Sequence, residues 1–224
     1  MRQPMMPANL LAACFALSLA SLAFAQSSQT ATVQIEFTNV NLLPPHWVLK
    51  IQSDGTGQYD SDPGQLAAND PSQSQTKAVH RPVQFKPEFV ERVLATARQR
   101  RFFDIPCESR LKVAFQGLKR LSYEGPDGKG ACEYNYAKDK EIQALGDSLI
   151  AVAGTLQFGA RLEMLMQHDR LGMDKEMEDL VSAVHDGNAQ ELEVIGETLE
   201  RIANDEQILD RVRRKARLLL AQAR

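Results

Sequence analysis

Alternation of apolar and polar residues along the first third of the chain is typical of β-strands. In "TVQIEFTNV" (32–40) every second residue is apolar, which predicts a strand with one buried face. "HWVLKIQS" (46–53) follows the same pattern, and shorter strands are expected near 57–60 and at 77–85. Because Pro82 lacks a backbone N–H, we expect the strand that contains it to lie at an edge of the sheet.

The stretch "QSDGTGQYDSDPG" (52–64) joins two of these strands and gathers several aspartates and glycines. A calcium loop needs oxygen ligands at fixed positions and a distal glutamate, and counting from Asp54 these positions do not match. The interpretation we favour over a metal site is a hairpin. Asp54-Gly55 would form its two-residue turn, Gly57 a bulge, and 61–76 a loop.

Helical spacing of apolar residues begins at Pro87 and predicts an amphipathic helix whose last turn carries Arg98, Arg100 and Arg101. The segment 117–137 then predicts a further hairpin around "GPDGKG".

From Lys138 onward the pattern is helical throughout. Gly154 and Gly159 predict a kink in the first helix of this part. Asn188, three residues before a glutamate, resembles a capping box and predicts a helix start, and Asn204 predicts the start of the last helix.

These elements indicate an α+β fold, in which a small antiparallel sheet packs on one or two helices and a C-terminal bundle of short antiparallel helices follows. The predicted organisation is a signal peptide over 1–25, an α+β domain over 31–160 and a helical hairpin appendage over 161–224.

The N-terminus has the features of a secretory signal peptide. Arg2 precedes an apolar run over 10–25 that ends in a small-x-small motif, which predicts cleavage after Ala25. The alternative is lipidation at Cys14 in "LAAC", but apolar residues follow this cysteine where a lipoprotein has a polar tether. Cleavage after Ala25 takes the formal net charge from −3 to −4, so nucleic acid is not an expected partner. The apolar run at 149–160 is too short for a membrane span, and we expect no integral span in the mature chain.

Two cysteines, Cys107 and Cys132, remain after such cleavage. In an oxidising compartment an even pair most simply forms one disulfide. A redox pair or a metal site is the alternative, although neither a C-x-x-C motif nor a neighbouring histidine accompanies them.

No catalytic, cofactor-binding or metal-binding residue is predicted from motifs. The four histidines form no H-E-x-x-H pair, and G-x-S-x-G and phosphate-loop motifs are absent from the sequence. The residues left for an unrecognised enzyme site in the sheet are Asp54, Asp60, His46 and His80. The basic run "RVRRKAR" (211–217) is interpreted as the solvated face of a helix.

The segments "WVLKIQSDGTGQYD" and "FKPEFVERVLATARQRRFFDIP" together resemble uncharacterised exported bacterial domains of unknown function, over roughly 45–140. That resemblance implies a small antiparallel sheet with a helix and no assigned activity. The last three helices are similar to HEAT-type helical hairpins, which implies at most a protein-contact surface.

The function expected from the sequence is therefore a non-enzymatic, exported protein of the bacterial envelope that binds another envelope protein. The alternatives are a hydrolase-type enzyme with an unrecognised site in the sheet, and an inhibitor-like or structural module that uses a disulfide-pinned hairpin. A pocket that combines His46 or His80 with two acids would favour the enzyme. A contiguous apolar patch on the 161–224 helices would favour partner binding.

Overall fold

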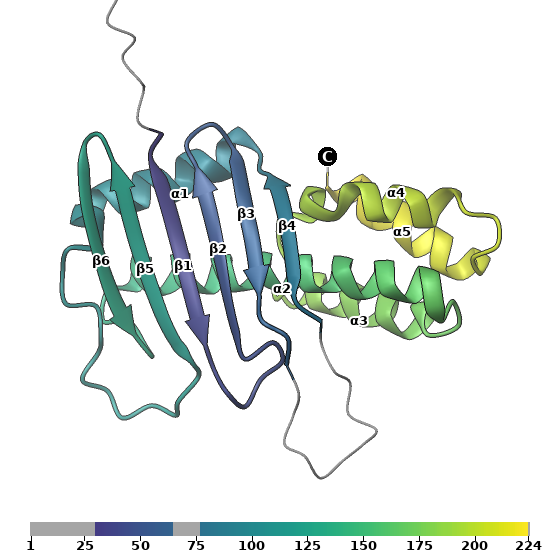
Figure 1. Cartoon of the computed structure of the whole chain (residues 1–224), viewed down its shortest axis with the longest axis horizontal. Helices are drawn as coiled ribbons and strands as arrows, with labels where there is room; N and C mark the ends of the chain where they lie inside the picture. Colours follow the sequence, from purple (N-terminus) through teal and green to yellow (C-terminus); the bar gives the residue numbers. More distant parts are fainter. Residues whose placement is uncertain (1–29, 65–76, 224) are drawn as a thin grey trace, which may run out of the picture.

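A single antiparallel sheet dominates the computed structural model, which describes residues 30–64 and 77–223 (Figure 1). The strand order within the described residues is β4-β3-β2-β1-β5-β6. The strands are β1 (Thr32–Thr38), β2 (His46–Gln52), β3 (Thr56–Ser61), β4 (Val79–Gln84), β5 (Leu118–Gly125) and β6 (Gly128–Tyr134). The predicted hairpin at 117–137 is therefore confirmed, and β4, which contains Pro82, lies at one edge as predicted.

The sheet forms because apolar side chains of neighbouring strands meet on one face. β1 lies between β2 and β5, so Ile35 is opposite Leu49 on one side and Leu121 on the other. All three side chains are fully buried. A shift of one residue in either pairing would turn these side chains to solvent, and this fixes the register.

The turn between β2 and β3 differs from its prediction. It has three residues, 53–55, and Gly55 adopts the left-handed conformation at φ +88°. Gly57 is not in a bulge, because it pairs regularly with Ile51. A Cβ on Gly57 would lie 2.6 Å from the Phe85 ring and 2.5 Å from the Lys50 carbonyl oxygen. The glycine is therefore required by the packing of Phe85 and not by the turn.

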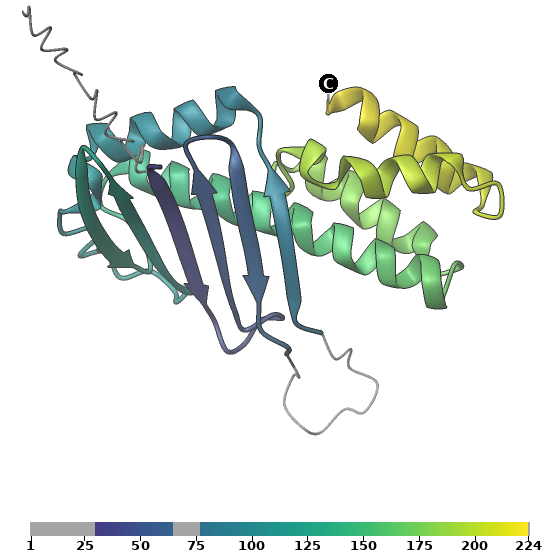
Figure 2. The same cartoon turned by 45° about the horizontal axis from the view of Figure 1, so that its top comes forward.

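The helices cover one face of the sheet and leave the other face open (Figure 2). α1 and α2 lie behind the sheet, and α3 to α5 pack beside it around the second half of α2 (Figure 1). The helical elements are α1 (Pro87–Gln99), η1 (Arg101–Phe103), α2 (Lys140–His168), α3 (Met173–His185), η2 (Leu192–Ile195), α4 (Gly196–Asn204) and α5 (Asp210–Gln222).

The long helix α2 belongs to both parts of the molecule. The predicted domain boundary at 160 falls inside it, and one continuous hydrophobic core extends from the sheet to the C-terminal helices. The helix runs without interruption through Gly154 and Gly159, where a kink was predicted. A Cβ on Gly159 would lie 2.4 Å from Cγ2 of Ile195, so this glycine permits close packing against η2.

The predicted starts of the last two helices are wrong. Glu191 takes the left-handed conformation at φ +52°, so the capping-box helix does not begin there, and α4 begins only after η2 without a side-chain cap. Before α5, the Asp205 carboxylate accepts a hydrogen bond from the N–H of Gln207 at 2.9 Å. This bond holds the preceding residues as a turn and delays the start of α5 to Asp210.

The basic run on α5 is largely paired with acids. Arg211 and Lys215 contact the Asp174 carboxylate on α3 at 2.8 and 3.2 Å, and Arg214 pairs with Asp210 one turn earlier. These contacts explain the cations as part of the helix packing.

Two expectations concern membranes and export. The predicted leader, its cleavage after Ala25 and the alternative lipid site at Cys14 lie outside the described residues. By length and hydropathy alone, α2 is the one described helix that qualifies as a membrane span, with 44% of its most apolar window buried in the protein. In this fold it packs between the sheet and α3 to α5.

A carboxylate pair lies where the C-terminal helices meet α1. Glu193 on η2 is 3.9 Å from the Lys86 ammonium, and Lys86 also donates to the Ala223 carbonyl at 2.5 Å. Glu191 pairs with Arg92 at 3.1 Å. Burial, followed by a hydrogen bond to Glu191 and its charge, raises the pKa of Glu193 to about 7.

We expect the contribution of Glu193 to the free energy of unfolding to fall as the pH rises from about 4.5 to 7. The reason is that the pKa of Glu193 is higher in the folded chain than its ordinary value of 4.5, so ionisation favours the unfolded chain. Glu193→Gln should stabilise the protein at pH 8 by on the order of 1–2 kcal/mol, after discounting for solvent screening, and the gain should disappear below pH 4.5. Urea unfolding across this pH range measures the difference. The exposed Glu206 offers the matched Glu206→Gln control, and equal pH profiles for both variants would contradict the assignment.

Gly57→Ala should destabilise the fold by about 1–3 kcal/mol, because the new methyl group would collide with both the Phe85 ring and the β2 backbone. Thermal unfolding measures the loss. Gly196→Ala is the control: no atom outside its own helix and neighbours lies within 4 Å of the added Cβ, and its backbone is already helical. This control should be neutral or slightly stabilising.

Candidate functional site

The disulfide predicted between Cys107 and Cys132 is present, with a Cα–Cα distance of 5.7 Å. It connects the segment after η1 to β6, and both cysteines are buried. Residues 108–117, which we call the anchored loop, follow Cys107 directly and lead into β5. The disulfide therefore fixes the start of this loop to the sheet.

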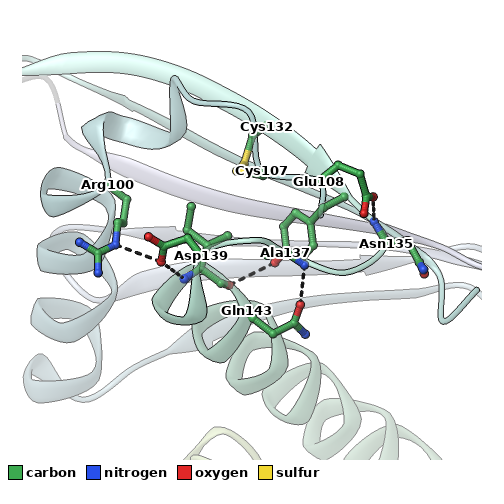
Figure 3. The surroundings of a disulfide bond; sticks show 10 residues. Arg100, Cys107, Glu108, Cys132, Asn135, Ala137, Asp139 and Gln143 are labelled. Atoms are coloured by element: carbon green, nitrogen blue, oxygen red, sulfur yellow. Dashed lines mark hydrogen bonds and ion pairs between the residues drawn. A yellow bond between two sulfur atoms is a disulfide. The ribbon is translucent and has the colours of Figure 1, made fainter. Parts of the chain in front are cut away.

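Hydrogen bonds extend this connection from the disulfide to the start of α2 (Figure 3). The N–H of Lys138 donates to the Cys107 carbonyl at 2.7 Å, and the N–H of Ala137 donates to the Gln143 side chain on α2 at 2.7 Å. Asp139 caps α2 by accepting from two backbone N–H groups and also bonds Arg100 at 3.1 Å. Burial opposes ionisation of this carboxyl, but these donors outweigh it and hold the pKa of Asp139 below its ordinary value.

A buried lysine holds the end of the anchored loop. The Lys119 side chain is only 2% exposed, and its ammonium donates to the carbonyls of Gly117 and Asn135 at 3.3 and 2.6 Å. It also lies over the Tyr134 ring at 5.6 Å. Burial lowers the pKa of Lys119, and the two carbonyls and the ring offset part of the cost of placing a charge there.

Asn135 contacts the anchored loop at three further points. Its side chain accepts from the N–H of Gln116 at 2.7 Å and donates to the Ala114 carbonyl at 3.1 Å. Its own N–H donates to Glu108 at 2.6 Å. The loop thus has little regular structure, but the disulfide connects its start to β6, and Asn135, directly after β6, bonds residues near both of its ends.

A groove runs along the exposed side of α2, and we call it the α2 groove. Its wider part, about 1020 Å³, lies between the anchored loop and the first turns of α2. Its second part, about 660 Å³, lies between the β1–β2 loop (39–45), α2 and the turn at 187–190. The two parts share Ala144 and Asp147, so they adjoin along α2.

The floor and walls of the α2 groove differ in character. Small residues on α2, Ala144, Ala151 and Gly154, line the floor, while Leu43 and Trp47 contribute an apolar wall. Some polar groups at its margin could still form hydrogen bonds with a ligand. Asp147 accepts one hydrogen bond, from the Gln143 side chain at 2.8 Å.

The residues proposed for an enzyme site lie on the open face of the sheet or in the β2–β3 turn. His80 contacts Asp60 at 2.8 Å, while His46 lies between Asp62 and Glu36 at 3.0 and 3.3 Å. The two histidines thus contact different acids and are not brought together.

Asp54 is in the turn, where it accepts hydrogen bonds from the backbone N–H and hydroxyl of Thr56, and these bonds lower the pKa of Asp54. Among the described residues, no three His, Cys, Asp or Glu side chains form a group suited to a metal ion.

One cavity does combine a histidine with two acids. It has a volume of about 560 Å³ beside β4, and His80, Glu163 and Glu176 are among its lining residues. However, Arg81 pairs with Glu163, and Arg161 bonds Glu176 at 2.6 Å. The His80 side chain is 76% exposed and contacts Asp60 on the open face. Both acids are therefore bound by arginines and neither contacts the histidine.

The disulfide could be predicted from the sequence, but the α2 groove could not. Ala144, Ala151 and Gly154 have no distinctive chemistry, and their shared position along the groove becomes visible only when the facing loops are placed. Lys119 was also missed, because a lysine in an alternating strand is normally expected to face solvent.

Loss of the disulfide should destabilise the protein by about 3–4 kcal/mol, since the closed loop spans 25 residues. Cys107→Ser/Cys132→Ser and the wild type with reductant should both unfold at lower urea concentration, and the wild type without reductant should show no titratable thiol from this pair. Reductant should not shift the double-serine variant any further. Two reactive thiols in the native, unreduced protein would contradict the bond.

Comparison with family models and curated proteins identifies no family or function for this chain. The chain matches no family model, and no curated protein matches it. The resemblances to exported bacterial domains and to HEAT-type hairpins therefore remain predictions.

Proposed function

We propose that this protein is an exported bacterial envelope protein that binds an extended segment of another protein in the α2 groove. The observation that carries the proposal is the groove itself, with its small-residue floor and apolar wall. The disulfide supports an oxidising location, because such bonds persist mainly in exported proteins.

The dimensions of the groove suit a peptide. Its lining residues on α2 run from Lys140 to Gln157, a distance of about 25 Å at the rise of an α-helix. Seven or so residues of extended chain cover the same length. Because Ala144 and Asp147 are exposed, the groove is open along α2 and does not enclose a compact ligand.

The position of this surface differs from the helical patch considered from sequence. The apolar faces of α3, α4 and α5 are occupied by one another and by α2, with Met177, Leu199 and Val212 fully buried. The exposed large apolar residues of this part come one or two from each segment: Met164 on α2, Leu171 in the turn before α3, Val181 on α3, Leu209 just before α5 and Leu218 on α5. The groove is therefore the better-supported contact surface.

Ala144→Trp should reduce binding of the partner by roughly tenfold or more, because the indole would fill the groove where its two parts meet. Folding should be nearly unaffected, since Ala144 is exposed. Quantitative affinity capture from envelope extracts, followed by site-specific photo-cross-linking from position 148, measures the loss and maps the bound segment.

The matched control is Ala221→Trp, at an exposed position on α5. A partner that the wild type and Ala221→Trp retain, and Ala144→Trp loses, supports the groove. Equal retention by all three proteins would contradict it, provided that their melting temperatures agree.

A further inference from the structure

Exposed apolar side chains gather at one end of the sheet. The β1–β2 loop and the anchored loop both project beyond the helices at this end (Figure 1), and we call them together the loop tip. Five of the eleven large hydrophobic residues exposed in the described chain lie here, and a sixth, Leu118, directly follows the anchored loop at the start of β5. The five are Val40, Leu42, Leu111, Val113 and Phe115.

The two loops of the tip are neighbours. A Cβ on Gly117, at the end of the anchored loop, would lie 2.4 Å from the Phe37 ring and 3.4 Å from Cβ of Asn39. Gly117 has φ +118°, a conformation that favours glycine. The close approach places the end of the anchored loop against the end of β1, where the β1–β2 loop begins.

Beyond Glu108, at the start of the anchored loop, the tip contains no acidic residue, although the protein as a whole is acidic. Neither 37–53 nor 109–123 contains an aspartate or glutamate, although the chain has 29 acidic residues and a negative net charge. Arg110 and Lys112 alternate with Leu111 and Val113 in the anchored loop. Neither cation makes an ion pair with any residue that the structure describes.

The fold holds these side chains outward. Phe115 is 60% exposed and Leu111 is 65% exposed, although Cys107, Lys119 and Asn135 tie the backbone beside them to the sheet. An anchored backbone prevents the apolar side chains from folding back over the core. Projecting loops that carry apolar and unpaired basic side chains suit a soft, negatively charged surface such as a membrane.

We propose that the loop tip binds the surface of an anionic phospholipid membrane. Leu111, Phe115 and Val40 enter the boundary between headgroups and acyl chains, while Arg110 and Lys112 contact lipid phosphates. This binding does not require the protein partner proposed for the α2 groove. It would orient the open end of that groove toward the membrane, because Leu42, Arg110 and Leu111 line the groove and also belong to the tip.

Co-sedimentation of the predicted mature chain (26–224) with two kinds of vesicle tests this proposal. We expect binding to vesicles that contain phosphatidylglycerol, weak binding to pure phosphatidylcholine, and loss of binding at high salt. Each basic side chain at such a surface contributes about fivefold in partitioning, so Arg110→Glu/Lys112→Glu should reduce binding by more than roughly tenfold. Phe115→Ser should cause a loss of similar size.

Matched controls use positions away from the tip. Leu171→Ser removes another exposed apolar side chain, and Arg201→Glu reverses another exposed cation without a described ion pair, so both should bind as the wild type does. Phe115→Trp supplies an insertion signal, because its fluorescence should shift to shorter wavelength on phosphatidylglycerol vesicles.

The proposal is overturned if the wild type binds neither vesicle, or if the control variants lose as much binding as the tip variants. Absence of a fluorescence shift from Phe115→Trp on anionic vesicles would also overturn it. Binding to polyglutamate but not to vesicles would show instead that the tip recognises an acidic polypeptide. None of these results depends on the groove partner, which Ala144→Trp tests separately.

Discussion

The burial of α2 is the constraint on which the rest of the structure depends. Its apolar residues are so numerous that packing on one side alone would leave many of them exposed. The helix therefore contacts the sheet along its first half and the C-terminal helices along its second. Gln157 reaches the sheet by bonding the Tyr59 hydroxyl at 3.0 Å. On another side, the buried Thr155 hydroxyl donates to the Gln190 carbonyl at 2.7 Å and accepts from its N–H at 2.9 Å. These contacts on several sides of α2 connect the sheet to the C-terminal helices.

The same arrangement creates the surfaces available for binding. One strip of α2 remains uncovered because the loops at the end of the sheet and the turn at 187–190 stand on either side of it, and this strip is the floor of the α2 groove. The anchored loop forms part of one wall and also extends past the sheet as the loop tip. The disulfide and hydrogen bonds maintain the shape of this loop. Its apolar side chains face outward, so they bury little surface and add little to its stability.

The strands, the amphipathic α1 and the disulfide could be predicted because each has a local signal. Ile35 and Phe37 belong to an alternating pattern, and two cysteines in a chain with a predicted secretory leader imply a bond. The predictions that proved wrong concern positions whose conformation depends on a residue far away in the sequence. Gly57 was assigned to a bulge because the packing of Phe85 could not be foreseen, and Gly159 to a kink because Ile195 lies far along the chain. Asn188 has the spacing of a cap, but Glu191 adopts a left-handed conformation in its tertiary setting.

The sequence by itself therefore determined the fold class, the order of the elements, the edge position of Pro82 and the cysteine pair, because hydrophobic periodicity, missing N–H groups and residue chemistry act over a few residues. Only the tertiary structure decided which glycines permit close packing, that Lys119 is buried, and that Ala144 and Gly154 line a groove. It also decided that Val40 and Phe115 share one exposed tip. These features arise from contacts between segments separated by tens of residues, and no local pattern encodes which segments will meet.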